Sequence, residues 1–189
     1  MRKSHIDFLR EMVTNIEIEE TVVFSPEKFF EYQPPMDQIE EQIPCAIIRF
    51  SEPTNVLGKK IKLRLEKIVR GNSTFIQYAV RQAKQDFKYT IDFWMNTPEA
   101  DVGSTVSNRG ILDQCVLYVS QRRWFKTEEQ IPIRVRLGKS SVVDDPAKES
   151  GNYKLYLEVI FNDGLYTIEE EETLSGVELE AAEPIIEGV

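Results

Sequence analysis

Histidine and cysteine are scarce in this chain, and their scarcity removes most of the usual catalytic and metal-binding motifs. Among 189 residues there are one histidine, His5, and two cysteines, Cys45 and Cys115, which lie far apart in the sequence. A zinc motif needs closely spaced cysteines or histidines, and a catalytic triad needs a nucleophile and an acid beside the histidine. We therefore expect no catalytic, metal-binding or cofactor-binding residue. His5 is expected at the surface, and both cysteines are expected to be buried, reduced thiols.

Long apolar runs, a secretory signal and nucleotide-binding loops are also missing. No stretch reaches the roughly 18 apolar residues that a membrane-crossing helix needs, and the first residues lack the apolar core of a signal peptide. We therefore expect a protein that is made in the cytoplasm and makes no membrane contact. Gly71 and Asn72 indicate a turn rather than a phosphate-binding loop. The acids Asp144, Asp145 and Glu149 lack the spacing of a calcium loop and are expected in a solvated loop.

What the chain does contain is an uneven distribution of charge. Its net charge is −9, yet residues 58–141 carry sixteen bases against eight acids. Residues 17–41 hold eight acids and one lysine, and residues 163–189 hold nine acids and no base. A basic middle between acidic flanks favours complementary contacts between copies of the chain or with another protein.

Hydrophobic periodicity predicts an α+β fold: a mainly antiparallel mixed sheet with an N-terminal helix and one long central helix packed on it. Helices are expected at residues 4–15 and 107–125. Strands are expected at residues 44–50, 60–69, 74–82, 87–95, 131–137 and 153–161. A reversal at 82–86 would make three of these strands an antiparallel meander. Residues 17–42 are expected to be an ordered loop with one helical turn, and 138–152 a projecting loop.

One domain, residues 1–168, is expected to contain the core, and residues 169–189 are expected to be an extended or disordered acidic arm. The predicted sheet residues of the core are Ile47, Leu63, Ile91, Phe93, Ile133, Val135, Leu155 and Leu157. Facing them, the central helix carries an apolar stripe that comprises Ile111, Leu112, Cys115, Val116 and Val119.

Arg122, Arg123 and Trp124, at the end of the predicted central helix, are the strongest candidates for a functional surface. The helix dipole explains the two arginines but not the tryptophan, and Trp with Arg is typical of the energetic centres of protein interfaces. We predict a subunit interface formed by Arg122, Arg123 and Trp124 together with Arg134 and Arg136. The alternative is that Trp124 turns inward and caps the core.

Nucleic-acid binding is a second alternative for the basic middle. Its bases are interleaved with aromatic residues that could stack on nucleobases, namely Tyr78, Tyr89, Trp94 and Trp124. An isoelectric point of about 4.8 and the acidic segment after residue 163 argue against this function.

The order of the predicted elements resembles the tail terminator (tail-completion) proteins of long-tailed bacteriophages. An N-terminal helix, a proline-bearing acidic loop and a strand beginning Pro44-Cys45-Ala46-Ile47-Ile48 precede the meander, the helix and the final strand pair, over about residues 4–168. The resemblance implies a non-enzymatic virion protein that is assembled in the host cytoplasm. It implies a ring, usually a hexamer, that caps the tail tube, joins it to the neck or head, and contacts tube, sheath and neck proteins.

The same resemblance implies no cofactor and no specific nucleic-acid binding, although DNA would pass through the lumen of such a ring. Two other functions stay open at this point. One is a different structural component of a phage neck or baseplate, and the other is a nucleic-acid-binding accessory protein.

Overall fold

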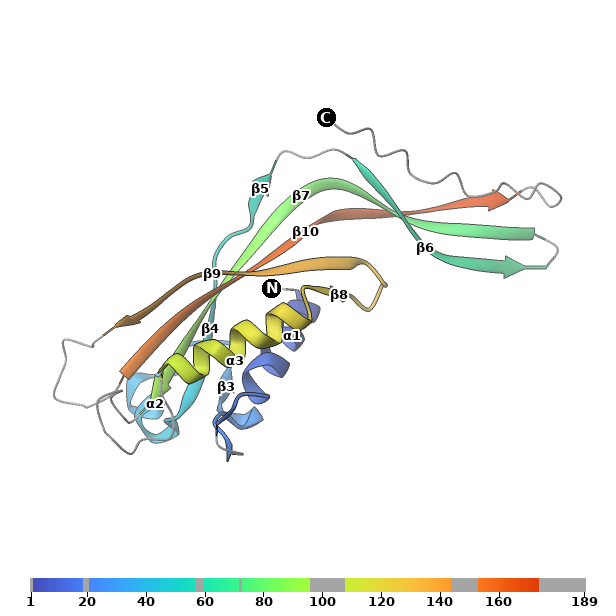
Figure 1. The fold of residues 1–189 in the computed structure, drawn as a ribbon. Coiled ribbons are helices and arrows are strands. Elements are labelled where there is room, and N and C mark those ends of the chain that lie inside the picture. The colour runs from blue at the N-terminus through green and yellow to red at the C-terminus, as the bar shows by residue number, and fades with distance from the viewer. Residues whose placement is uncertain are drawn as a thin grey trace. The chain divides into compact units, whose positions relative to one another are not determined.

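The computed structural model describes residues 2–18, 21–56, 60–71, 73–95, 108–143 and 153–173 (Figure 1). They form an α+β protein that divides into two compact units. The first unit comprises Met1–Gly58 and Ala83–Leu165, and the second comprises Lys59–Gln82 and Tyr166–Val189. Two long strands, β7 (Ser73–Met95) and β10 (Tyr153–Thr173), contribute residues to both units.

The first unit is built on a curled, six-stranded mixed sheet in the order β3-β4-β7-β10-β9-β8. Its other strands are β3 (Phe29–Phe30), β4 (Cys45–Phe50), β8 (Trp124–Lys126) and β9 (Pro132–Val143). β3 runs parallel to β4, whereas the β4–β7, β9–β10 and β8–β9 pairs are antiparallel. The short strand β5 (Thr54–Val56) also pairs with β7, and β1 (Glu17–Ile18) pairs with β2 (Thr21–Val22) in a separate ribbon.

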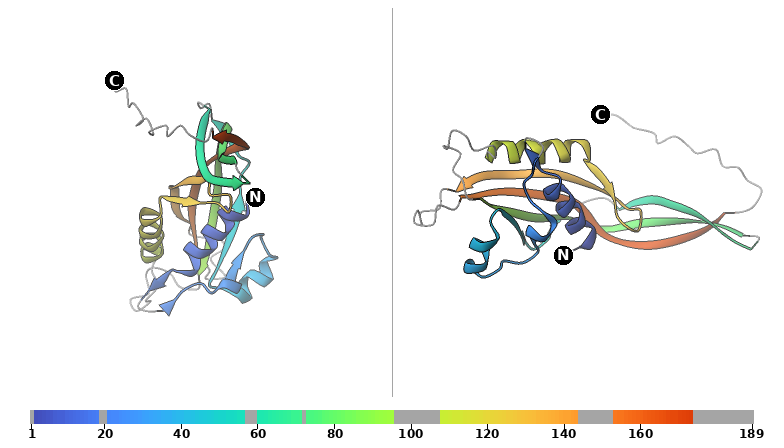
Figure 2. Two further views of the ribbon diagram at one scale, coloured as in Figure 1. Left: turned by 90° about the vertical axis from the view of Figure 1, so that its right-hand side faces the viewer. Right: turned by 90° about the horizontal axis from the view of Figure 1, so that it is seen from below.

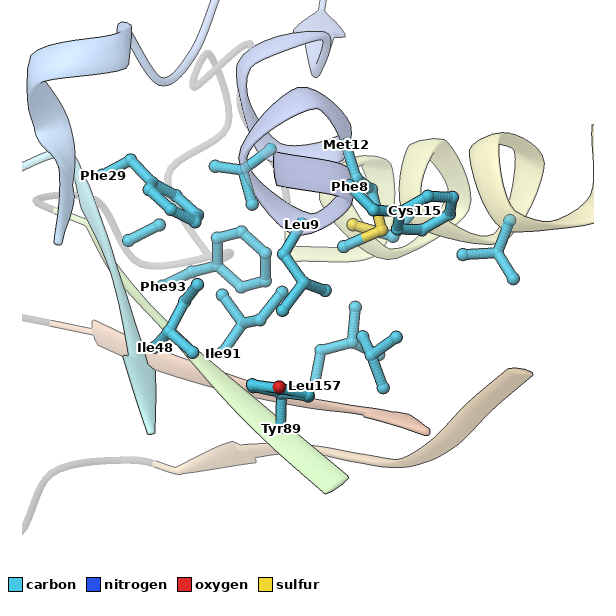
Figure 3. Packing of buried hydrophobic residues seen from close by; sticks show 14 of the residues in the cluster. Phe8, Leu9, Met12, Phe29, Ile48, Tyr89, Ile91, Phe93, Cys115 and Leu157 are labelled. Atoms are coloured by element: carbon cyan, nitrogen blue, oxygen red, sulfur yellow. The ribbon is translucent and has the colours of Figure 1, made fainter. Parts of the chain in front are cut away.

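Two helices, α1 (Lys3–Thr14) and α3 (Asn108–Gln121), cover one face of this sheet (Figures 1 and 2). Each helix presents an apolar stripe at three- and four-residue spacing, which is the pattern that a helix packed on a sheet requires. Phe8, Leu9 and Met12 of α1 and Cys115 of α3 point into the same core as Tyr89 and Ile91 of β7 (Figure 3).

A third helix, α2 (Met36–Gln42), belongs to a smaller apolar cluster on the opposite face of β4. That cluster contains Ile39, Cys45, Ile47 and Trp94. The sheet is therefore covered on both faces near β4, which is why β4 carries an almost continuous apolar sequence.

Most of the predicted core is confirmed. The residues confirmed as buried in the main cluster are Ile91, Phe93, Ile111, Cys115, Val119, Ile133, Val135, Leu155 and Leu157. Four predicted positions differ. Ile47 is buried on the other face of the sheet, Leu63 belongs to the second unit, Leu112 is only partly buried, and Val116 is 52% exposed.

The predicted reversal at residues 82–86 is wrong, and with it the three-stranded meander. β7 continues without a break for 23 residues, because this polar stretch contains no glycine or proline to turn the chain. Its backbone instead pairs with β5, where Val56 is opposite Lys84 and Thr54 is opposite Asp86. Polar side chains on an exposed strand were mistaken for a turn.

Several predicted boundaries also shift. The loop predicted at 17–42 contains β3 and α2 beside the expected helical turn, η1 (Pro26–Lys28). The central helix is shorter than predicted and ends at Gln121, so that Trp124 lies in β8. β9 runs six residues beyond Leu137, and the remainder of the predicted loop, including Asp144, Asp145 and Glu149, lies outside the described residues.

The second unit is a small sheet formed by β6 (Ile61–Arg70), residues 73–82 of β7 and residues 166–173 of β10. Among its described residues only Ala79 and Val80 are buried. Exposed ion pairs also connect its strands: Arg70 forms a two-point ion pair with Glu170 at 2.9 and 3.1 Å, and Lys62 pairs with Glu171. Residues 169–173 of the expected arm are part of β10, and residues 174–189 lie outside the described residues.

Candidate functional site

Trp124 is the most exposed tryptophan or phenylalanine of the first unit, at the edge of the sheet. It is 62% exposed, so the alternative in which it turns inward to cap the core is wrong. Its neighbour Phe125 is half-buried against the main core, and alternation along a strand places Trp124 and Lys126 on the opposite face. Arg134 of β9 is directly opposite Trp124 in the strand register and shares that face.

The hydrogen-bond pattern of β8 leaves the backbone groups of two of its three residues pointing away from the sheet. Val135 N–H donates to the carbonyl of Arg123 at 2.8 Å, and Thr127 N–H donates to the carbonyl of Ile131 at 3.0 Å. Trp124 and Lys126 therefore occupy the intervening positions, whose N–H and C=O groups face outward. β8 is the last strand in the order of the sheet, and within the described ranges no other strand pairs with this edge.

A tight loop holds β8 in this position. Gln130 N–H donates to the carbonyl of Thr127 at 2.9 Å, and Ile131 N–H donates to the Thr127 hydroxyl at 3.2 Å. Thr127 is buried, and Gln130 adopts a left-handed backbone conformation with φ of 61°. These contacts fix the position of the free edge of β8.

A groove of about 320 Å³ lies alongside this edge, with β8 on one side and α1 on the other. Its floor and walls include the rings of Phe8, Trp124 and Phe125. The acids that line it already have basic partners: Asp7 is 3.3 Å from Arg10, Glu128 is 2.8 Å from Lys3, and Glu11 pairs with Arg122.

Arg122 forms contacts within its own chain, with Glu11 and Tyr118, which the sequence did not indicate. Besides Glu11 of α1, its guanidinium donates to the Tyr118 hydroxyl at 2.6 Å and lies 4.6 Å from the centre of the Tyr118 ring. Burial and the nearby Glu11 carboxylate raise the pKa of Tyr118 to about 12. Arg122 thereby connects the end of α3 to α1, and it lines the groove.

The other predicted interface residues divide into two groups. Arg136 lies 3.4 Å from Asp86, which also accepts a hydrogen bond from Asn162 at 2.6 Å. Arg123 and Arg134 are exposed, and within the described residues neither forms an ion pair. Trp124 and Arg134 therefore lie side by side, and Arg123 precedes Trp124 in the sequence. Arg122 and Arg136 form ion pairs within the chain.

The aromatic residues proposed for base stacking are not displayed together. Tyr89 and Trp94 are buried in the two cores of the first unit. Tyr78 belongs to the second unit, where the Lys62 ammonium lies 4.1 Å from its ring centre. A buried ring offers no face to a base, so two of the four proposed stacking positions are lost.

His5 contradicts the prediction of a surface histidine. It is fully buried, its Nδ1 is 3.1 Å from the Tyr89 hydroxyl, and its Nε2 is 3.2 Å from Oδ2 of Asp163. Asp163 is also fully buried; its Oδ1 accepts a hydrogen bond from Gly164 N–H at 2.7 Å, and its Oδ2 is 2.9 Å from Arg2. The sequence did contain an indication that His5 is buried. Leu9 and Met12 follow His5 at four and seven residues, which places the histidine on the apolar stripe of α1.

This buried cluster is a structural element of the core. The His5 ring stacks on Phe161 with ring centres 4.3 Å apart and meets Phe87 and Tyr89 edge-on. With His5 and Asp163 wholly inaccessible, neither can touch a substrate in this conformation. Within the ranges that the structure describes, no group of His, Cys, Asp or Glu is arranged to hold a metal ion.

The two cysteines are buried and unpaired, which confirms the expected burial. Burial raises the pKa of the Cys45 thiol to about 11 and that of Cys115 to about 12. Since the thiolate is the nucleophilic form, both thiols are poorly reactive at neutral pH.

Stability should decrease when the pH falls below the usual pKa of histidine. Burial lowers the pKa of His5, with Arg2 acting in the same direction and Asp163 opposing it. The unfolded chain therefore binds a proton below about pH 6.5 that the folded chain resists, and the free energy of unfolding falls there while remaining level above about pH 7. Urea unfolding at a series of pH values tests this. His5 is the only histidine, so the slope should disappear in His5→Gln, and an unchanged slope in that variant would assign it to carboxylates.

Comparison with models of known protein families gives no match, and comparison with curated protein sequences gives none either. None of the helices in the described part of the chain is long and apolar enough to cross a membrane.

Proposed function

We propose that this chain is a non-enzymatic structural subunit that assembles with copies of itself through the β8 surface, defined as Arg123, Trp124, Lys126 and Arg134. The assembly is a ring of the kind formed by phage tail terminator proteins, most often a hexamer. It caps the tail tube and joins it to the neck or head. The observation that carries the proposal is the exposed Trp124 on an unpaired sheet edge.

An exposed tryptophan at an unpaired sheet edge is unfavourable in a monomeric protein. A large ring in water loses the stabilisation that burial provides, and unpaired strand edges invite association with other chains. The edge also carries bases without ion-pair partners among the described residues, and the chain elsewhere carries an excess of acid. A surface of this kind fits a heterologous contact, in which one patch meets a different patch of the next copy and the copies close into a ring.

The α+β architecture supports the resemblance to tail terminators in its coarse features. The N-terminal helix, the mixed sheet and the central helix occur in the predicted order. Tube, sheath and neck proteins are the further partners that this function implies, in a virion assembled in the host cytoplasm. Nucleic-acid binding is less well supported, because Tyr89 and Trp94 are buried and cannot stack on nucleobases. Of the features that suggested this function, mainly the lysines and arginines that could contact phosphates remain.

Trp124→Ser should convert the assembled protein to monomers. The substitution removes the large apolar surface at the centre of the proposed contact, while a side chain that is 62% exposed contributes little to the fold. Native mass spectrometry and size-exclusion chromatography with light scattering measure the change. Arg123→Glu with Arg134→Glu should act in the same direction without breaking an ion pair of the described chain.

Tyr32→Ser is the matched control, because Tyr32 is 70% exposed and belongs to the same unit. It should leave the mass of the assembly unchanged, and circular dichroism should show the same fold for all variants. A parent protein that remains monomeric at high micromolar concentration would overturn the proposed ring. An assembly that survives Trp124→Ser would overturn the β8 surface as its contact.

A further inference from the structure

We infer that the free edge of β8 accepts residues 174–189 of a second copy as an added strand, held in the groove between β8 and α1. The inference rests on the proposed self-assembly and names the segment that enters the contact. The chain extends sixteen residues past Thr173, the last described residue, and these residues contain four glutamates and no base.

The backbone of β8 provides the first argument. The N–H and C=O groups of Trp124 and Lys126 point outward from a strand that the Thr127–Ile131 loop holds in place. An extended segment can satisfy these groups with main-chain hydrogen bonds, which is how peptides add to exposed sheet edges. The groove supplies the space for such a strand directly beside the edge.

Charge provides the second argument, and it selects the occupant. The acids of the groove are paired within the chain, whereas Arg123, Lys126 and Arg134 form no ion pair among the described residues. The remaining positive charge disfavours a symmetric contact of one β8 with another, because like charges would face each other. It favours an acidic strand.

The alternating sequence of the segment provides the third argument. Residues 177–180 read Val-Glu-Leu-Glu, so in an extended conformation the glutamates share one face and the apolar residues share the other. With Glu178 and Glu180 on the face of Lys126 and Arg134, Val177 and Leu179 fall on the face of Phe125. There the groove is lined by Phe8 and Phe125.

The segment that would be added, residues 174–189, and the edge that would receive it, β8, are different parts of the chain. This is the condition for a head-to-tail contact. Each copy would place its acidic segment on the basic edge of the next copy, and the same contact would recur until the ring closes. Each segment and each edge would then be used once. Contact energy then comes from backbone hydrogen bonds and burial of Trp124, while charge sets the orientation.

Disulfide trapping between full-length copies tests the inference. One partner carries Lys126→Cys, and the other carries a single cysteine at position 177, 178, 179 or 180. Oxidation of mixed copies should link Lys126→Cys to Glu178→Cys or Glu180→Cys at least about fivefold more than to Val177→Cys or Leu179→Cys, because strand addition places alternate residues on one face. The native thiols are buried and stay unlinked, and Tyr32→Cys replaces Lys126→Cys in the control.

A charge variant gives a second measurement. Replacing Glu178, Glu180, Glu183 and Glu187 by glutamine in the full chain should weaken assembly by roughly tenfold at low salt, as expected for the loss of about three exposed ion pairs. The difference should shrink as salt screens the charges.

The outcomes separate the two proposals. Assembly by the parent with no preferential link, or links of equal strength at all four positions, overturns the added strand and leaves the proposed ring standing. Alternating links in an assembly of two copies support the strand and overturn the ring. A parent that does not self-associate overturns both.

Discussion

Arg2→Met should lower the free energy of unfolding by about 3 kcal/mol, because it leaves the Asp163 carboxylate buried without its guanidinium. Asp163 has no exposed surface, and the Arg2 guanidinium is its nearest cation, at 2.9 Å. The Arg2 side chain is 32% exposed, so we expect the lower end of the range for a broken buried pair. Urea unfolding followed by circular dichroism, at a pH where His5 is neutral, measures the loss.

A double variant isolates the electrostatic part of this effect. Arg2→Met combined with Asp163→Leu removes both charges and should recover at least half of the loss, since an apolar replacement of a buried pair is often nearly neutral. The residual cost comes from Gly164, whose N–H loses its acceptor and whose carbonyl loses the donor on Arg2. Mild acid should also reduce the loss in Arg2→Met, because protonated His5 can replace the guanidinium. A single-variant loss below about 1 kcal/mol would show that the carboxylate is hydrated.

Phe161→Ala should lower the free energy of unfolding by about 3–5 kcal/mol, the range for removing a fully buried aromatic ring. Phe161 has no exposed surface and stacks on His5. Its ring also meets Phe8 and Tyr89 edge-on, with ring centres 5.7 and 5.4 Å apart. The cavity would open between α1 and β10, where α1 has little means of collapsing onto the sheet because the Arg2–Asp163 pair fixes its start.

Leu165→Ala is the matched control on the same strand. Leu165 is 50% exposed and belongs to the same unit, so the same truncation to alanine should cost less than about 1 kcal/mol. Equal losses in the two variants would mean that α1 does not seal the core over Phe161.

The sequence by itself determined the fold class and most of the core. Alternation in β9 and the three- and four-residue stripe of α1 each specify one buried face, because only one side of such an element can meet the core. The burial of Ile91, Phe93, Ile133 and Leu157 was predictable for this reason. The sequence also suggested that Trp124 is exposed. The helix dipole explains Arg122 and Arg123 but not a tryptophan beside them, whereas a protein interface explains all three.

Boundaries between elements were less predictable, since local polarity does not distinguish a turn from an exposed strand. Gln82, Lys84 and Gln85 have the composition of a reversal, yet the chain stays in one strand here, and Lys84 and Gln85 pair with β5. Trp124 and Phe125 continue the helical pattern of α3, yet pairing with β9 draws them into a strand. In each case a partner distant in sequence overrides the local preference.

Only the tertiary structure decided which charged residues meet. Glu11 and Arg122 are 111 positions apart, and Arg2 and Asp163 are separated by 161, so no periodicity relates them. His5 became a core residue because β10 brings Asp163 to the ring and β7 brings Tyr89. The free edge of β8 has the same origin: the register of the sheet, which depends on all its strands together, determines which backbone groups remain without a partner.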